Sequence, residues 1–243
     1  MKSLVTHRAA LACLAQRLAF GCLLTLSSGG AFAATATPVF EDRFEGREEI
    51  GEQYRTGRGH QGGWKVVEGS LVGEQVRSDH GATIRWKADY ADLDLTFDFE
   101  FAGGTRFNVV FDDKKEKSVH AGHICRVSVS PRMVSLSDDK TGSMNLKVRE
   151  MRKDKDLSQE KQAELQAILE ETASKAKVRL KQGKRYTLRV RIEDDTMSVA
   201  LDGKPVASLT SPGLAHPTKN ELGFTVNGKR FVFDNIVTYD VAR

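Results

Sequence analysis

Most of the chain beyond residue 33 consists of short runs in which apolar and polar residues alternate. In the clearest run, LDLTFDFEF at 93–101, every odd-numbered residue is leucine or phenylalanine and every even-numbered residue is polar. Neighbouring side chains of a β-strand point to opposite faces, so burial of the aromatic face turns the acidic face toward solvent. Similar runs at 106–111, 124–130, 186–192 and 196–201 predict further strands of this kind.

Pairs of residues that tolerate a positive φ angle separate several of these runs. They are Glu68-Gly69, Asp202-Gly203 and Asn227-Gly228. Each pair predicts a tight hairpin between the two flanking strands. Many short strands joined in this way favour an antiparallel sandwich over a parallel α/β sheet. The sequence therefore predicts a mostly β fold, an antiparallel two-sheet jelly-roll sandwich.

One segment, at about 156–177, breaks the alternating pattern. It is rich in Glu, Gln, Ala, Lys and Leu, and Leu165, Ile168 and Leu169 recur at helical spacing. Asp156 or Ser158 can cap its beginning. We expect one inserted amphipathic helix, which either packs on the sandwich edge or binds a partner protein.

The first 33 residues have the features of a cleavable export signal. They contain three cations and no acid, an apolar run at 18–26, and the small-x-small sequence Ala31-Phe32-Ala33. The apolar run is too short for a membrane anchor in the mature protein. We therefore expect a signal peptide at 1–33 and a single exported domain at 34–243, located in the periplasm or outside the cell.

Removal of the signal changes the charge and the cysteine count. Three of the 37 cations and none of the 33 acids leave, so the net charge of the mature chain falls from +4 to +1. A nearly neutral domain lacks the field that binds phosphate backbones, and nucleic acid is not an expected partner. Cys125 is the one cysteine that remains, so no intramolecular disulfide forms, and its apolar surroundings favour a buried thiol over a nucleophile.

Asp98 and Glu100 are candidate catalytic residues. Glycoside hydrolysis uses two carboxyl groups placed across the scissile bond, and these two project from the same side of one predicted strand. Their β-carbons would lie about 7 Å apart, a separation that suits either stereochemical outcome. A solvated outer face of the strand is the competing interpretation.

Basic and amide side chains form a second cluster, which is a candidate ligand-binding site. It comprises Arg106, Asn108, His120, His123 and Arg126. Arginine offers a forked donor and asparagine both a donor and an acceptor, which suits sugar hydroxyls or a carboxylate.

Metals and aromatic rings are the remaining candidates. No zinc site is predicted at His120 and His123, because no further ligand accompanies them in a recognised pattern. No cofactor is predicted either, although Asp112 and Asp113 could bind calcium; a charged turn explains them more simply. The ring of Trp64 could stack on a sugar, whereas the alternation at 82–90 places Trp86 in the core.

Four segments resemble one family. GGWKVVEGSLVG, ATIRWKADYADLDLTFDFEF, RFNVVFDD and LGFTVNGKRFVFDNIVTYDV are similar to the concanavalin A-like domain of the 3-keto-disaccharide hydrolase type. The resemblance covers most of the mature chain and implies a concanavalin A-like jelly roll in a divergent secreted bacterial protein. Active members of this family act on oxidised disaccharides or glycosides.

These observations predict a secreted carbohydrate-active domain. A sugar-derived small molecule would bind on an outer sheet face, and an active enzyme would hydrolyse it there. The surrounding residues would be Asp98, Glu100, Arg106, Asn108, His123 and Arg126. The alternative is a non-catalytic module that binds glycan or protein. A purely structural role for these residues is the third interpretation, and the sequence does not specify the oligomeric state.

Overall fold

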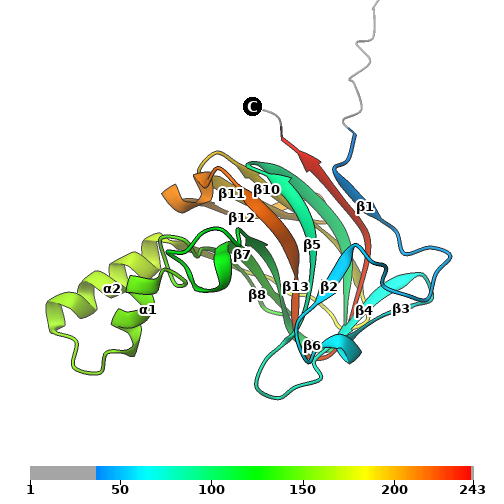
Figure 1. Cartoon of the computed structure of the whole chain (residues 1–243), viewed down its shortest axis with the longest axis horizontal. Coiled ribbons are helices and arrows are strands. Elements are labelled where there is room, and N and C mark those ends of the chain that lie inside the picture. The colour runs from blue at the N-terminus through cyan, green and yellow to red at the C-terminus, as the bar shows by residue number, and fades with distance from the viewer. Residues whose placement is uncertain (1–36, 242–243) are drawn as a thin grey trace, which may run out of the picture. The chain divides into compact units, whose positions relative to one another are not determined.

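The structure is a computed structural model, and it describes residues 37–241. The predicted signal peptide at 1–33 lies outside this range. Within it, thirteen antiparallel strands form one hydrogen-bonded sheet that folds over into two layers (Figure 1). This confirms the predicted mostly β sandwich.

Two long strands, β6 (Leu93–Asp112) and β13 (Lys219–Asp240), run through both layers. The first sheet has the order β12-β11-β10-β6-β13-β4-β3, with β1 also paired to β13. Its other strands are β1 (Phe40–Asp42), β3 (Trp64–Val67), β4 (Ser70–Glu74), β10 (Arg185–Glu193), β11 (Thr196–Leu201) and β12 (Lys204–Thr210).

The second sheet has the order β9-β8-β7-β6-β13-β5-β2. Its other strands are β2 (Tyr54–Thr56), β5 (Ala82–Tyr90), β7 (His123–Ser130), β8 (Met133–Asp138) and β9 (Ala173–Lys177). Three short 3-10 helices join strands: η1 (Gln61–Gly63), η2 (His120–Gly122) and η3 (Pro212–Ala215).

The fold-over is visible in ring contacts within β13. The rings of Phe224 and Phe233 stack with centroids 4.4 Å apart, although nine residues of straight strand would span about 30 Å. The strand bends at Asn227-Gly228, where Gly228 has a φ of 92° and the register with β6 shifts. The predicted hairpin at this pair is therefore wrong, because the flanking segments lie in different sheets and pair with different parts of β6 instead of with each other.

The two other predicted hairpins are confirmed. Glu68-Gly69 joins β3 to β4, and Asp202-Gly203 joins β11 to β12. All four residues have positive φ angles, between 48° and 74°. This conformation matches the right-handed twist of paired strands.

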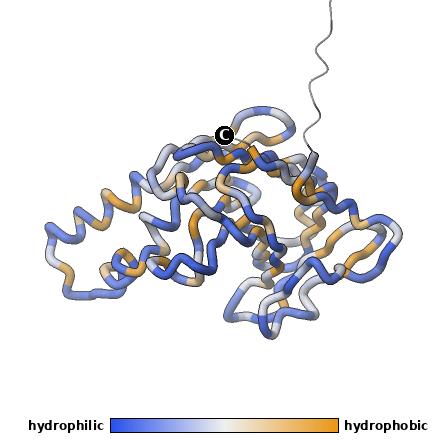
Figure 2. Tube along the Cα trace, turned by 45° about the horizontal axis from the view of Figure 1, so that its top comes forward, coloured by the Kyte–Doolittle hydropathy of each residue, from blue (hydrophilic) through white to orange (hydrophobic). Residues whose placement is uncertain are grey.

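The core lies between the two sheets and is built from the apolar faces of the alternating runs. In Figure 2 hydrophobic and hydrophilic segments alternate along the strands. Every odd-numbered residue of 93–101 is at most 1% exposed. Cys125 and Trp86 are also buried here, as expected, and burial raises the pKa of the Cys125 thiol.

The helical insertion differs from its prediction. It contains two helices, α1 (Leu146–Lys153) and α2 (Gln159–Glu171), beside the ends of β7 and β8 (Figure 1). The predicted helix at 156–177 extends too far, because residues 173–177 form β9 against β8. Ser158 caps α2, as one of the two predicted alternatives, and no residue of α2 is fully buried. Among the described residues no helix is long and apolar enough to span a membrane.

Candidate active site on the second sheet

Five of the predicted ligand-binding residues meet at the outer face of the second sheet. Arg106 and Asn108 alternate on β6 with the buried Phe107, so they face outward. Arg126 on β7 lies opposite Val110, one step further along the same face. His123 begins β7, and His120 lies just before it in η2, with the two imidazole centroids 6.3 Å apart.

Asp98 and Glu100 lie on the outer face of the first sheet instead. Phe97, which precedes Asp98, is buried in the core, and its ring centroid lies 6.2 Å from that of Phe107 of the second sheet. The outward faces of the two sheets therefore point away from each other. The expectation that all these residues surround one ligand is therefore wrong. It failed because β6 folds over between 101 and 106, which a local pattern of alternation does not reveal.

Neighbouring strands hold the Asp98 carboxylate in place. Oδ1 accepts a hydrogen bond of 2.6 Å from Thr187 Oγ1, and Oδ2 accepts one of 2.9 Å from Asn235 Nδ2. Glu100 lies opposite Arg185 of β10, whose guanidinium pairs with Asp234.

Trp64 is also placed differently from its predicted role. Its side chain is buried at 4% exposure, packs 6.1 Å from the ring of Phe233 and covers Gly73. A β-carbon at Gly73 would lie 2.6 Å from this ring, so the glycine makes room for it. The ring is part of the core and offers no exposed surface on which a sugar could stack.

Asp112 and His123 form a hydrogen-bonded dyad at the end of β6. His123 Nδ1 lies 2.6 Å from Asp112 Oδ1. The carboxylate is fully buried, whereas the imidazole is 19% exposed. With Nδ1 donating its proton to the carboxylate, Nε2 carries a lone pair, which is the arrangement of a general base oriented by an acid.

Two further cations keep Asp112 ionised. Arg85 Nε lies 3.3 Å and Lys114 Nζ 3.2 Å from Asp112 Oδ2. Burial opposes the charged carboxylate, but the hydrogen bond from His123 and these positive charges outweigh it and hold the pKa of Asp112 well below its usual range. The anionic partner of His123 is therefore maintained at neutral pH.

Arg85 is fixed on the sheet by its own contacts. Its Nη1 donates to the backbone carbonyls of Ile84 and Phe224 at 3.0 and 2.9 Å. It crosses Gly223 of β13, where a β-carbon would lie 2.5 Å from Arg85 Cδ. The absence of a side chain at Gly223 thus allows the guanidinium to reach Asp112.

A second buried carboxyl lies on the other side of the dyad. Asp139 is 1% exposed, and its Oδ1 lies 3.2 Å from Arg126 Nη2 and accepts a hydrogen bond of 2.9 Å from Ser143. Oδ2 is buried without a hydrogen-bond partner among the described residues. Burial raises the pKa of Asp139 to about 6, although the Arg126 charge partly opposes this.

A pocket adjoins the dyad network on the β2 and β5 side. Its wall includes Arg85 and Glu221, which also belong to the network: Glu221 pairs with Arg55 and lies 3.3 Å from Lys114. The complete lining is Phe40, Glu52, Gln53, Tyr54, Arg55, Arg85, Trp86, Lys87 and Glu221. Charged groups thus surround a concave surface beside aromatic side chains, a combination suited to a polar ring.

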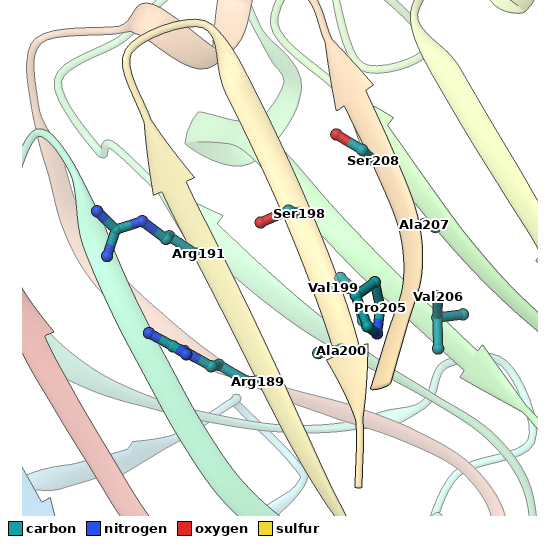
Figure 3. Close-up of a pocket in the computed structure, with 9 residues that line it drawn as sticks. All are labelled: Arg189, Arg191, Ser198, Val199, Ala200, Pro205, Val206, Ala207 and Ser208. Atoms are coloured by element: carbon teal, nitrogen blue, oxygen red, sulfur yellow. The ribbon is translucent and has the colours of Figure 1, made fainter. Parts of the chain in front are cut away.

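A groove on the first sheet is the main competing site (Figure 3). Arg189 and Arg191 project over β10 beside the small or apolar residues of β11 and β12. Both guanidinium groups are bound by Asp94, and Arg191 also by Glu193. The cations are thus neutralised, and no residue lining this groove is a histidine or a carboxylic acid.

The residues considered for metals are engaged in other contacts. Asp113 accepts hydrogen bonds from Thr218, Asn220 and the Lys115 amide, and lies 3.1 Å from His216 Nε2. Between residues 37 and 241 no group of three or more His, Cys, Asp or Glu residues is arranged to hold a metal ion.

The comparisons with known proteins identify the family. Residues 40–238 match the 3-keto-alpha-glucoside-1,2-lyase-like domain. The chain belongs to this family. The match covers nearly all described residues, and confirms the resemblance inferred from the four sequence segments. No curated protein matches the chain.

Solved structures show that this lyase-like domain has the fold of several carbohydrate-active proteins. The laminarinase from Rhodothermus marinus has 11% sequence identity and a TM-score of 0.57, covering 86% of this chain and 98% of that one. The carbohydrate binding module CBM66 from Bacillus subtilis has 18% identity and a TM-score of 0.50, covering 77% and 96%. A sialidase has 13% identity and a TM-score of 0.57, but this chain spans only 19% of its length. At these identities the likeness concerns the fold alone.

Sequence reasoning missed four members of the site in this lyase-like domain, one of which is Lys114 in the turn after β6. Arg85 and Glu221 occupy outward positions of alternating runs, so the same argument that selected Arg106 could have found them. Asp139 follows β8 in a loop, and only its contact with Arg126 identifies it. The sequence offered Asp112 as a possible calcium ligand, whereas the contacts of its carboxylate are His123, Arg85 and Lys114.

Proposed function

We propose that this domain binds a keto sugar or keto-glycoside on the outer face of the second sheet, and that His123, oriented by Asp112, acts there as a general base. The Asp112–His123 dyad is the observation that carries the proposal. It combines a partly exposed imidazole with a buried carboxylate whose pKa lies below its usual range, and the five residues predicted from the sequence to bind sugar lie on the same face.

The chemistry follows from the family to which the chain belongs. A carbonyl at C3 of a glucoside acidifies the hydrogen at C2. His123 Nε2 would take this proton, and the electron pair of the C2–H bond would form an enolate and then a C1–C2 double bond. The C1–O bond breaks, and the departing alkoxide takes up a proton to leave as an alcohol. Proton abstraction beside a carbonyl needs a base and a group that stabilises the enolate oxygen.

Cations beside the dyad could supply that stabilisation. Lys114 contacts the dyad carboxylate, and Arg126 is a quarter exposed, with Nη2 bound to Ser143 and Asp139. Partial burial of these two cations strengthens their interaction with a developing oxyanion. Burial raises the pKa of the Asp139 carboxyl to about 6, so ionisation of this group would change the net charge beside Arg126.

The test is turnover of an aryl 3-keto-α-glucoside, with the released phenol followed by absorbance and the sugar product by mass. Elimination gives a product lighter by one water than hydrolysis does. The informative variants are His123→Gln and Asp112→Asn, and the matched controls on the first sheet are Asp98→Asn and Glu100→Gln. Calorimetric titration of a non-cleavable keto sugar measures binding separately.

We expect His123→Gln to lower kcat/KM by about 10²- to 10⁴-fold, the usual contribution of a general base, with little change in Kd. Both control variants should retain wild-type turnover. Loss of activity in Asp98→Asn or Glu100→Gln, with His123→Gln unaffected, would move the chemistry to the first sheet. Saturable sugar binding without any turnover would refute the catalytic role and support a non-catalytic glycan-binding module.

A further inference from the structure

A second groove lies on the same outer face as the dyad, at the opposite end of the strands. It crosses β13, β6, β7 and β8, and its volume of 490 Å³ falls in the range of small-molecule sites, about 300–1,000 Å³. It is lined by Thr105, Arg106, Ser128, Ser130, Met133, Ser135 and Asn227. Three of these seven residues are serines, and Arg106 and Asn227, which lie opposite each other, add a guanidinium and an amide.

Cations stand at both sides of this groove. Arg106, on β6, is exposed and lies opposite Asn227. On the far side β9 pairs with β8, which places Lys177 opposite Met133 and Lys175 opposite Ser135. Both lysines are exposed and occupy outward positions, because Ala176 between them lies opposite the buried Val134.

None of these three cations has an anionic partner within the described part of the chain: no carboxylate lies within 4.0 Å of them. This distinguishes them from the arginines around the dyad and in the first-sheet groove, each of which is paired with an aspartate or glutamate. Unpaired cations at both sides of a polar groove favour an anionic ligand.

The groove floor also leaves hydrogen-bonding groups for a ligand. Ser128 Oγ donates to Asn108 Oδ1 at 2.5 Å, which leaves the Asn108 amide nitrogen as a donor, and Ser130 bonds the backbone of Met133. The Ser135 hydroxyl makes no side-chain hydrogen bond with another described residue. Hydroxyl and amide groups of this kind match sugar hydroxyls, whereas guanidinium and ammonium groups match a carboxylate or a sulfate.

The groove and the dyad are separated by a distance that several sugar rings would span. Arg106 at the groove and Asp112 in the dyad are six residues apart on β6, which corresponds to about 20 Å along the strand. The intervening face carries Val110 and Arg126, opposite each other on β6 and β7. A single extended ligand can therefore reach both ends.

We infer that this groove binds an acidic sugar unit, one with a carboxylate or a sulfate group, in an oligosaccharide whose other end lies at the dyad. The inference rests on the proposed function for the position of the reacting end. It extends that function by making the substrate an anionic oligosaccharide, where the dyad alone would accept a short neutral glycoside.

The test compares three oligosaccharides of equal length by calorimetric titration of the full chain: one of uronic acids, one sulfated and one neutral. The variants are Arg106→Ala and the double variant Lys175→Ala/Lys177→Ala, with Arg106→Lys as the charge-conserving variant. Lys204→Ala, an exposed lysine of β12 in the first sheet, is the matched control. Turnover of the short aryl 3-keto-α-glucoside is measured in parallel.

We expect at least one acidic oligosaccharide to bind more tightly than the neutral one, and added salt to weaken that preference. Each groove variant should weaken its binding by about tenfold, the effect of one lost charge-assisted hydrogen bond, while Arg106→Lys and Lys204→Ala retain it. If the oligosaccharide of uronic acids shows this preference, the anion recognised is a carboxylate; if the sulfated one does, it is a sulfate. Turnover of the short glucoside should not change in Lys175→Ala/Lys177→Ala.

Equal binding of neutral and acidic oligosaccharides, or acidic binding that survives all three alanine substitutions, would overturn the inference. These results are distinct from failure of the proposed function, which would appear as turnover that does not depend on His123. Anionic binding that depends on Lys204 as much as on Arg106 would indicate general attraction to a basic surface and would also refute the groove.

Discussion

Asp139→Asn should stabilise the protein at neutral pH and leave its stability unchanged in acid. Burial raises the pKa of the Asp139 carboxyl from 3.8 to about 6. The folded protein therefore binds this proton more tightly than the unfolded chain does, and the free energy of unfolding falls as the pH rises from about 4 to about 6. Above that range the buried carboxylate is ionised in the folded protein and destabilises it.

The size of the effect follows from the two pKa values. Their difference corresponds to about 3 kcal/mol, because each pKa unit is worth about 1.36 kcal/mol. Asparagine has nearly the same shape, does not ionise, and can still accept the hydrogen bond from Ser143. We expect Asp139→Asn to gain up to about 3 kcal/mol over wild type at pH 8, and to match it near pH 4.

Urea denaturation from pH 4 to pH 8, followed by the fluorescence of Trp64 and Trp86, measures this difference directly. Both indole rings are buried, so unfolding changes their environment. Ser143→Ala is a useful control, because it removes a neighbour of Asp139 without removing the titrating group. A difference between wild type and Asp139→Asn that is the same at every pH would refute the reasoning, as would a variant less stable than wild type at pH 8.

Two further predictions test the fold. Phe224→Ala and Phe233→Ala should each lower the free energy of unfolding by about 3–5 kcal/mol. Because the two rings stack across the bend of β13, a double-mutant cycle measured by denaturation should give a coupling energy of about 0.5–1.5 kcal/mol. A coupling energy of zero would contradict that contact. Asn145→Ala should lower the free energy of unfolding by about 1 kcal/mol, because Asn145 Oδ1 accepts a hydrogen bond from the Lys147 amide at the beginning of α1. Amide hydrogen exchange in α1 should be faster in this variant than in wild type, and an unchanged rate would contradict the cap.

The strands were predictable because their signal is local. Alternation at 93–101 and 186–192 assigns each residue to the inner or the outer face without knowledge of any partner strand, and the structure confirms both faces. Asp94 on the outer face is nevertheless buried, because Arg189 and Arg191 bind it. The Asp202-Gly203 turn is equally local, since two residues with positive φ join strands that are adjacent in sequence.

The bend of β6 and β13 could not be predicted in this way. Asn227-Gly228 has the same local preference as a hairpin turn, but the two segments around it pair with different halves of β6. The choice between a hairpin and a corner between sheets depends on which strands are available elsewhere in the chain. The consequence for the site is large, because the bend separates Asp98 from Asn108 although both face outward on one strand.

The helical insertion shows a similar limit. The composition at 156–177 favours a helix throughout, yet residues 173–177 join the sheet because β8 offers an unpaired edge. Conversely, α1 was not predicted, and its cap at Asn145 is the local signal that identifies it. The sequence predicted a binding role for His123 but not its pairing with Asp112. That pairing depends on the register of β6 with β7.

The most direct test of His123 as a base is exchange of the C2 proton of a 1,5-anhydro-3-keto sugar in D₂O. This analogue has no group to lose at C1, so proton abstraction is observed without elimination, and NMR follows the loss of the C2 signal. The account predicts exchange well above the protein-free rate with wild type and with Asp98→Asn, and exchange at the protein-free rate with His123→Gln. Equal exchange in wild type and His123→Gln would contradict it.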